Sequence, residues 1–151
     1  MTAVRELRWR VEHVDTDAGG VVHFTRYASL LESALLENLD QLGVGVRGLG
    51  AEGLELAVRD LRMRYAASAR FLDRVRVAVR VERVAGATCE VSGAVHRESD
   101  DDTPGELLAS GTLVLCVVER ATGRAAPLPS SLRRAMWGWK RETGTEGDCD
   151  D

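Results

Sequence analysis

The stretch FTRYASLLESALLENLDQL, residues 24–42, decides the fold because it carries the longest helical periodicity in the chain. Its apolar residues recur every three or four positions, which is the spacing of a helix that buries one face. They are Tyr27, Leu30, Leu31, Ala34, Leu35, Leu39 and Leu42. Gly43 follows directly, as is typical of a helix C-terminus. The sequence therefore predicts one long helix over residues 24–42.

Strand-like patterns lie on both sides of this helix. Before it, residues 4–13 alternate loosely between apolar and polar side chains and predict a first strand. After it, residues 44–53 contain four glycines and are expected to form a loop or a short irregular turn. Residues 54–67 then resume the alternation, with a change of phase near Asp60 that indicates a β-bulge.

Three further segments complete the pattern. Residues 72–84 show the clearest period of two in the chain, and residues 87–98 continue it. The run SDDDTPG, residues 99–105, predicts a turn. Residues 106–119 are apolar on both phases, which is typical of a strand buried on both faces. The order is therefore a strand, one helix and about four long antiparallel strands.

This order predicts the α+β class. A single helix cannot cover both faces of an antiparallel sheet of about five strands. The simplest arrangement wraps the sheet around its helix and leaves the other face, or an edge, to pair with a second copy of the chain. We therefore expect a homo-oligomer.

Length and composition limit the class of protein. The 151 residues correspond to about one domain of ordinary globular composition. No apolar run reaches the roughly 18 residues of a membrane helix, and the charged start lacks a signal-peptide core, so we expect a cytoplasmic protein without a membrane partner. The net charge of −4 argues against nucleic-acid binding. The three cysteines form no CxxC pair, and Cys89 and Cys116 are expected in the core.

Side chains with chemical potential gather in the loop before the helix, HVDTDAGGVVHF, residues 13–24. The loop holds two aspartates, two histidines and a pair of glycines. A helix N-terminus offers unpaired backbone N–H groups and a partial positive charge, which suit a developing oxyanion. Glycines let a substrate approach the backbone closely. A carboxylate a few residues earlier can attack a carbonyl carbon held there, or activate water, so this loop is a candidate hydrolase site.

Two other interpretations of the loop stay open. An aspartate before a helix is commonly a cap or a turn former. The alternation of His13, Asp15 and Asp17, with His23 as a fourth ligand, would also suit a divalent metal ion, and that interpretation predicts loss of activity with chelators. The sequence contains neither a GxSxG elbow nor a P-loop.

The string DTDAGGVVHFTRYASLLESALLENL, residues 15–39, resembles the opening signature of hot-dog-fold acyl-CoA thioesterases of the 4-hydroxybenzoyl-CoA thioesterase and YbgC-like group. Residues 58–84 resemble the family's next two strands and the turn between them, and residues 107–132 resemble its final strand and closing segment. The resemblance implies a hot-dog domain over residues 1–134. It also implies dimers with a continuous sheet, often paired into tetramers, with active sites between the subunits.

The resemblance further implies hydrolysis of an acyl thioester, carried by CoA or by an acyl-carrier protein, without a cofactor. Asp17 matches the family's catalytic carboxylate, which attacks the thioester carbonyl or activates water. Phe24 matches the residue whose backbone N–H polarises the thioester oxygen. Some relatives carry a second catalytic histidine at the position of Phe24, whereas here the adjacent His23 is the nearby imidazole and is expected to assist.

Other residues receive supporting roles from the resemblance. Gly20 matches the glycine that keeps the loop tight. The residues expected at the substrate are Gly20, Val22, Arg26 and Tyr27. Asp15 is expected to make structural hydrogen bonds, and Glu32, on the helix, is expected to be a buried structural partner.

Two other functions remain open on the same fold. Hot-dog 3-hydroxyacyl-thioester dehydratases use a histidine and a carboxylate from different elements, so an aspartate before the helix favours hydrolysis. A non-catalytic acyl-CoA-binding module would leave Asp17 unexplained. The leucine-rich helix indicates an apolar acyl or aromatic group, in fatty-acid, aromatic or polyketide metabolism.

The C-terminal residues 135–151 depart from the family pattern and are expected to form an extension. Met136, Trp137 and Trp139 are expected to pack on the domain or on a partner. The acidic end is expected to be disordered.

Overall fold

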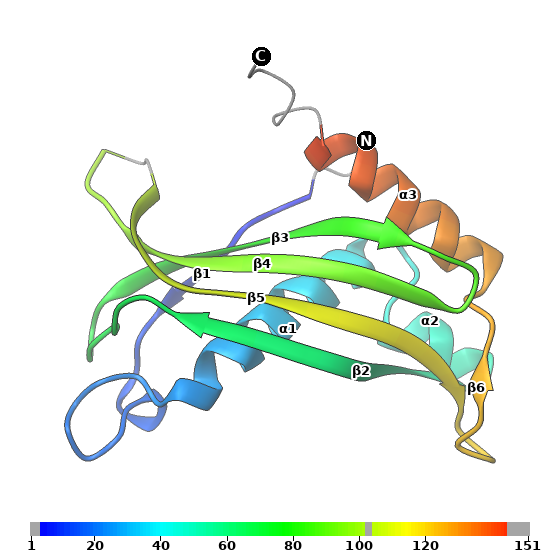
Figure 1. Cartoon of the computed structure of the whole chain (residues 1–151), viewed down its shortest axis with the longest axis horizontal. Helices are drawn as coiled ribbons and strands as arrows, with labels where there is room; N and C mark the ends of the chain where they lie inside the picture. Colours follow the sequence, from blue (N-terminus) through cyan, green and yellow to red (C-terminus); the bar gives the residue numbers. More distant parts are fainter. Residues whose placement is uncertain (1–3, 102–103, 145–151) are drawn as a thin grey trace.

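The computed structural model describes residues 4–101 and 104–144 (Figure 1). The strands are β1 (Leu7–Arg10), β2 (Leu54–Tyr65), β3 (Arg74–Val84), β4 (Thr88–Glu98), β5 (Pro104–Glu119) and the short β6 (Ala125–Ala126). The helices are α1 (Phe24–Gln41), α2 (Val46–Ala51) and α3 (Ser130–Gly144), and the 3-10 turn η1 (His13–Asp15) precedes α1. None of the described helices is long and apolar enough to cross a bilayer.

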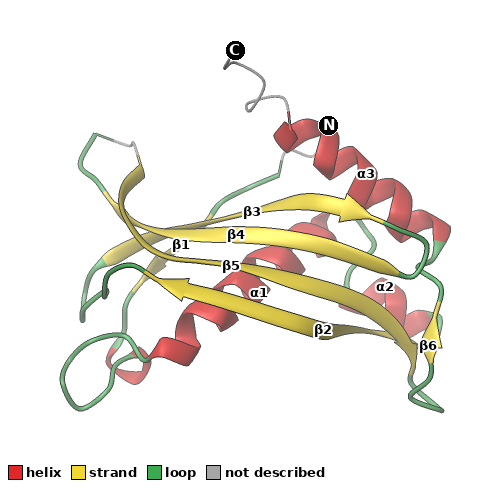
Figure 2. Ribbon diagram, in the orientation of Figure 1, coloured by secondary structure: helices red, strands yellow, loops and turns green. Residues whose placement is uncertain are grey.

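The strands form one antiparallel sheet in the order β1-β3-β4-β5-β2, and β6 pairs with the end of β5. α1 lies across one face of this sheet, behind β4 and β5 in the view of Figure 2. The predicted α+β fold, a curled antiparallel sheet around one long helix, is confirmed. β2 stands last in the order, so its outer edge pairs with no strand of the described chain.

α1 buries the face that its periodicity predicts. The helix begins at Phe24, as predicted, and ends one residue earlier than expected, at Gln41. Its buried apolar residues are Tyr27, Leu30, Leu31, Ala34, Leu35 and Leu39. They share one hydrophobic core with the inward-facing residues of β3, β4 and β5, and this core fixes the start of α1 relative to the sheet.

Two paired glycines let α1 approach the sheet closely. Gly93 of β4 faces Gly111 of β5 across the strand pair. A Cβ on Gly93 would lie 2.5 Å from Cδ2 of the fully buried Leu31, and a Cβ on Gly111 would lie 3.3 Å from Cδ1 of the same side chain and would also meet Sδ of Met63. The missing side chains therefore make room for Leu31 at the centre of the core.

The segment between α1 and β3 confirms one local prediction and corrects another. The register of β2 against β5 shifts between Val58 and Asp60, which is the predicted bulge. Residues 44–53, expected to be a loop or a short irregular turn, instead contain the regular helix α2. Gly45 caps α2 against the end of α1, where a Cβ would lie 2.8 Å from the backbone nitrogen of Asp40. This glycine therefore serves a close helix contact, which composition alone did not reveal.

Two strands, β1 and β5, also differ from the sequence-based expectation. β1 covers only Leu7–Arg10 of the predicted residues 4–13, because the chain turns into η1 directly afterwards. On β5, mainly the side chains that face the core are buried. Of the other apolar side chains, Leu107 is exposed and Val114 is only half-buried. The prediction of burial on both faces therefore fails for β5 in a single copy of the chain.

Two cysteines lie in the described residues, Cys89 on β4 and Cys116 on β5, and they face opposite sides of the sheet. Cys89 is buried in the core, as predicted, and burial, reinforced by the nearby Glu90 charge, raises the pKa of its thiol to about 12. Cys116 is half-buried rather than a core residue, because its neighbours Leu115 and Val117 take the inward phase of β5. The neutral Cys89 thiol has little nucleophilic character.

α3 covers residues on both sides of the boundary predicted between residues 134 and 135. Met136 and Trp139, in the predicted extension, are each 1% exposed and belong to the main core, while Trp137 is 45% exposed. α3 lies beside β3, along the part of that strand that β1 does not reach (Figure 1). The predicted disorder of the acidic end concerns residues outside the described ranges.

Candidate active site

Asp17 lies in a tight turn that is closed by its own backbone. Its N–H donates to the carbonyl of Val21 over 2.9 Å, and its carbonyl accepts from the N–H of Gly20 over 3.0 Å. Its Oδ1 accepts from the N–H of Gly19 over 2.8 Å. Gly20 adopts φ +80°, a left-handed conformation that favours glycine. Oδ2 of this exposed carboxylate has no hydrogen-bond partner within the described residues.

The turn leads directly into the start of α1. His23 is the N-cap, and its Nδ1 accepts from the N–H of Thr25 over 3.3 Å and lies 2.7 Å from the Thr25 hydroxyl oxygen. Phe24 is the first residue of the helix. Its N–H finds no acceptor in the described part of the chain, as expected for the first turn of a helix. This N–H and the partial positive charge of the helix start can polarise a carbonyl oxygen.

Asp15 holds the loop from inside. It is 4% exposed, and its carboxylate accepts hydrogen bonds from Trp9 Nε1 at 3.0 Å, the N–H of Glu12 at 2.8 Å and Arg26 Nε at 2.7 Å. Burial opposes its ionisation, but the hydrogen bonds from Glu12 and Trp9 and the Arg26 charge outweigh burial and hold the pKa of Asp15 below its ordinary value of 3.8. The expectation of a structural Asp15 is borne out by these contacts.

The same contacts bear on the metal-site interpretation of His13, Asp15, Asp17 and His23. Both oxygens of Asp15 already accept hydrogen bonds from protein donors, so this carboxylate is not free to bind a cation. Within residues 4–101 and 104–144, no group of three or more histidine, cysteine, aspartate or glutamate side chains is arranged to hold a metal ion.

The residues predicted at the substrate lie in different environments. Gly20 is in the exposed turn, whereas Val22 and Tyr27 are 6% and 3% exposed and form part of the core behind it. The Tyr27 hydroxyl accepts from the N–H of Ala69. Arg26 directs its Nε at Asp15. Val22 donates its N–H to the carbonyl of Ala69 over 2.9 Å, so the segment after β2 supports the loop from behind.

Glu32 contradicts its expected role as a buried partner. Its side chain is exposed and borders a groove of about 360 Å³ between α1, α2 and the β2 edge. Most of the residues that line this groove are apolar, among them Leu35, Leu36, Val46, Leu54, Leu56 and Val58. Helical periodicity places Glu32 beside the buried stripe of α1, and its side chain lies at the border of this groove rather than in the core.

Sequence reasoning missed the part played by Tyr65. Its hydroxyl donates to the carbonyl of Phe24 over 2.9 Å, and its ring packs edge-on against the rings of Phe24 and Tyr27. Tyr65 ends β2, so it connects the free edge of the sheet to the first turn of α1. The signal available in the sequence was its position at the start of the family-like turn after that strand.

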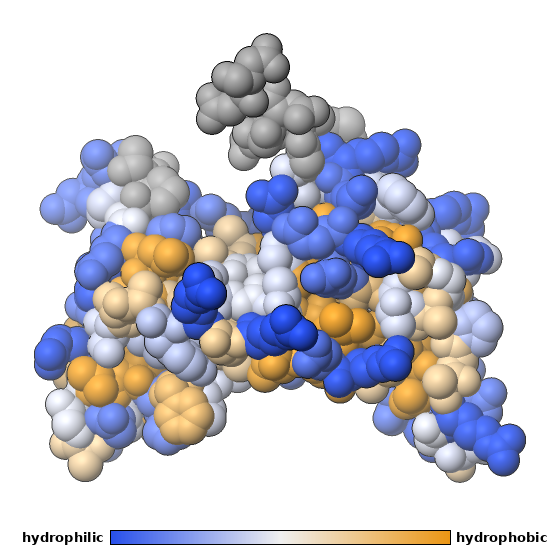
Figure 3. Space-filling model, viewed as in Figure 1, coloured by the Kyte–Doolittle hydropathy of each residue, from blue (hydrophilic) through white to orange (hydrophobic). Residues whose placement is uncertain are grey.

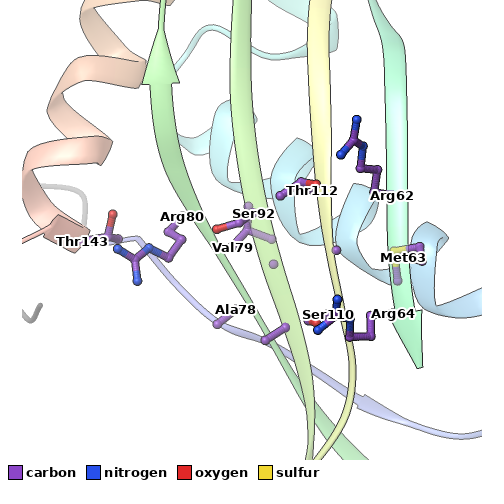
Figure 4. A pocket seen from close by; sticks show the side chains of 13 residues that line it. Arg62, Met63, Arg64, Ala78, Val79, Arg80, Ser92, Ser110, Thr112 and Thr143 are labelled. Atoms are coloured by element: carbon purple, nitrogen blue, oxygen red, sulfur yellow. The ribbon is translucent and has the colours of Figure 1, made fainter. Parts of the chain in front are cut away.

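A second hollow, of about 840 Å³, lies on the outer face of the sheet, away from the loop. Figure 4 shows small side chains from β4 and β5 on its floor and Arg62, Arg64 and Arg80 around it, and Figure 3 shows the same face with a pale centre between hydrophilic residues. Arg80 pairs with Glu82 and Arg62 lies 3.7 Å from Asp60. These carboxylates offset two of the three positive charges, and none of residues 13–24 lines the hollow.

The chemistry of the loop follows from its geometry. One oxygen of Asp17 and the N–H of Phe24 are both unpaired within the described residues, and the hydrogen-bonded loop of residues 18–23 separates them. A carboxylate and an oxyanion donor suffice for acyl transfer when the leaving group is good, as a thiolate is. On a curled sheet around one helix, this arrangement is the one that the resemblance to hot-dog thioesterases implies.

Comparisons with known proteins agree with this class. The family model described as the thioesterase-like superfamily matches residues 11–136. The acyl-CoA thioester hydrolase YbgC of Escherichia coli O157:H7 is 34% identical over 127 residues, 83% of this chain and 91% of that protein. The chain belongs to the thioesterase-like superfamily.

Solved structures share the fold. The hypothetical protein TT1821 from Thermus thermophilus has 30% identity and a TM-score of 0.78, covering 89% of this chain and 98% of that one. The dynemicin thioesterase, studied for polyene binding, has 26% identity and a TM-score of 0.77, covering 89% and 95%.

Proposed function

We propose that this protein hydrolyses acyl-CoA thioesters, with Asp17 as the nucleophile or general base and the Phe24 N–H as the oxyanion donor. The observation that carries the proposal is that one tight loop holds both a carboxylate oxygen and a helix-start N–H that are unpaired within the described residues. The similar YbgC protein bears the name of an acyl-CoA thioester hydrolase, which supports CoA as the thiol carrier.

The proposed reaction proceeds by activation of the thioester carbonyl, attack on its carbon atom and loss of the thiolate. The thioester carbonyl oxygen accepts a hydrogen bond from the Phe24 N–H, which stabilises the negative charge that develops there. Asp17 then either attacks the carbonyl carbon itself or takes a proton from a water molecule that attacks it. The C–S bond breaks, the thiolate leaves and is protonated, and the products are the free acid and CoA. An anhydride formed by direct attack would be hydrolysed by water in a further step.

Neighbouring residues take supporting roles in this proposal. Gly20 lets the turn bring its backbone close to the thioester. Val22 and Tyr27 form the buried wall behind the loop. The Nδ1 of His23 accepts from Thr25 and its Nε2 has no partner within the described residues, so the neutral ring carries its proton on Nε2 and can donate a hydrogen bond to the leaving thiolate.

We further propose that a second copy pairs along the free edge of β2. An exposed strand edge is a template for another strand, and Val58, Leu61 and Tyr65 on this strand are each 46% exposed. Two β2 strands that pair antiparallel would place the Leu54 end of one copy opposite the Tyr65 end of the other. The groove beside Leu54 would then lie near the Asp17 loop of the second copy, in a dimer or in a tetramer of two dimers.

This arrangement indicates an apolar acyl group. The groove is lined mostly by leucine and valine side chains, which suit a fatty-acyl, polyketide or aromatic substituent. The polyene binding described for the dynemicin thioesterase is consistent with such a substrate. An acyl-carrier protein as the thiol carrier, and a cytoplasmic location, stay predictions of the sequence.

Thiol release from a panel of CoA esters tests the proposed function. The panel contains short, long and aromatic acyl groups and one 3-hydroxyacyl ester, and a matching set on an acyl-carrier protein. The proposal predicts release of free CoA, most rapidly with an apolar acyl group. Loss of water from the 3-hydroxyacyl ester without thiol release would identify a dehydratase, and binding of the esters without turnover would identify a binding module.

A further inference from the structure

The turn that carries Asp17 is rigid in itself, but its internal bonds do not place it relative to α1. The hydrogen bonds among Asp17, Gly19, Gly20 and Val21 close on each other, and an isolated bridge joins Val21 to Arg70 behind the loop rather than to α1. A hydrolytic site needs its carboxylate at a fixed distance from the oxyanion donor, because a displacement of about 1 Å can cost roughly 100-fold in rate. Contacts outside the turn must therefore set its position.

One ion pair connects the two arms of this loop. Asp15 lies two residues before Asp17, and Arg26 lies two residues after Phe24. Arg26 Nε and Asp15 Oδ1 are 2.7 Å apart, and the carbonyl of Asp15 accepts from the N–H of His23 over 2.8 Å. The pair therefore closes the loop just outside the two groups that the proposed reaction uses.

The ion pair is itself held on several sides. The other oxygen of Asp15 accepts from Trp9 Nε1 and from the N–H of Glu12. The Arg26 guanidinium lies 5.1 Å from the centre of the Trp9 ring, and its Nη1 donates to the Ser29 hydroxyl over 2.9 Å. Contacts from β1, from the segment before η1 and from α1 thus converge on one buried carboxylate.

We propose that Asp15 and Arg26 are positioning residues for thioester hydrolysis: their ion pair sets the distance between the Asp17 carboxylate and the Phe24 N–H. This inference rests on the proposed function. It gives Arg26 a role other than substrate contact, since its guanidinium is committed to Asp15, Ser29 and the Trp9 ring.

Steady-state kinetics of Arg26→Gln test the inference. Gln removes the charge and keeps a polar side chain, so we expect kcat to fall roughly 100-fold while KM stays within about twofold. Arg26→Lys keeps the charge but not the planar fork of donors, and it should recover kcat to within about tenfold of the wild-type value. A substrate-binding arginine would instead raise KM, and an unchanged kcat in Arg26→Gln would overturn the inference.

A control ion pair joins α2 to the other end of α1. Arg47 pairs with Asp40 near the end of α1, with Arg47 Nη2 2.7 Å from Asp40 Oδ2 and both side chains exposed. Arg47→Gln removes an arginine–aspartate pair of similar geometry that is far from the loop in sequence, and it should leave kcat unchanged. If Arg26→Gln fails to fold, Arg26→Lys decides: a kcat lowered about tenfold at constant KM supports positioning, and a wild-type kcat contradicts it.

A double-mutant cycle shows whether Arg26 acts through Asp17. In the Asp17→Asn background, Arg26→Gln should cause no further loss of rate, because the group that it positions is already gone. Losses that multiply would mean that Arg26 acts independently of Asp17 and would overturn the inference. The proposed function fails separately, and this inference with it, if the wild type hydrolyses no ester or if Asp17→Asn alone keeps full activity.

Discussion

The Tyr65 hydroxyl donates a hydrogen bond of 2.9 Å to the carbonyl of Phe24, across 41 positions in the sequence. This bond fastens the end of β2, the free edge strand of the sheet, to the first turn of α1. This hydrogen bond therefore connects Phe24, the proposed oxyanion donor, to β2, the strand of the proposed subunit contact. A change at the edge strand is expected to reach the active site through this contact.

Tyr65→Phe tests that link. The substitution keeps the ring contacts with Phe24 and Tyr27 and removes one hydrogen bond that contributes about 1 kcal/mol. We expect kcat to fall about fivefold with a small loss of thermal stability. Steady-state thiol release and thermal unfolding measure the two effects, and a wild-type kcat would show that the bond does not support catalysis.

Phe24→Pro removes the proposed oxyanion donor without removing a structural hydrogen bond. Proline suits the first helical position, and the Phe24 N–H has no acceptor in the described chain. Loss of one oxyanion donor typically costs 100- to 1,000-fold in kcat, and we expect roughly that loss. Phe24→Ala is the control: it keeps the N–H and removes a ring that is 62% exposed, so kcat should change little. Equal activity of the two variants would contradict the role of this N–H.

A charged residue on the edge strand tests the proposed subunit contact. Leu61→Lys places a positive charge on β2 where Leu61 is 46% exposed, and lysine blocks strand pairing at edges. The wild type should have at least twice the chain mass of 16.4 kDa in light scattering, and the variant should have the mass of one chain. Leu107→Lys, at another exposed leucine, should leave the mass unchanged. A monomeric wild type would exclude the contact.

The pH dependence of stability tests the environment of Asp15. A folded-state pKa below 3.8 means that Asp15 stabilises the fold fully above pH 3.8 and loses this contribution as the pH falls through the folded-state value. Asp15→Asn should therefore cost about 2–3 kcal/mol near pH 7, below the range for fully buried pairs because the Arg26 side chain is 30% exposed. Urea unfolding of both proteins should give a constant difference from pH 7 to about pH 5 and a smaller one below pH 4. A difference that grows at low pH would contradict the sign of the shift.

Local periodicity was enough to predict the central parts of the fold. α1 follows a helical repeat of apolar residues, and the bulge near Asp60 interrupts the alternation of a strand. Both patterns involve neighbouring residues, so they are visible in the sequence. α3 carried the same kind of signal, with Leu132, Met136 and Trp139 at helical spacing, but its polar composition concealed it. α2 depends on the packing of Gly45 against Asp40, a contact that no local pattern encodes.

In the candidate site too, local patterns could be predicted from the sequence, whereas contacts between distant residues could not. Asp17, Gly20 and Phe24 were predicted as site residues because they lie in one short signature at the start of a helix, and their roles stay predictions. The contacts of Asp15 with Trp9 and Arg26, and the bond from Tyr65, join residues on different elements, so they become visible only in three dimensions. Glu32 was misplaced because its burial depends on what covers α1, which its own periodicity does not specify.

The most direct test of the account is the steady-state rate of thiol release by Asp17→Asn on the best ester of the panel. Asn has the size of Asp but is neither a base nor a nucleophile, and the turn around it retains its backbone hydrogen bonds. The account predicts a kcat at least about 1,000-fold lower with unchanged thermal stability, while Asp40→Asn, an equal change of charge at an exposed site, keeps the wild-type rate. An Asp17→Asn variant that releases thiol at the wild-type rate would contradict the assignment of this carboxylate.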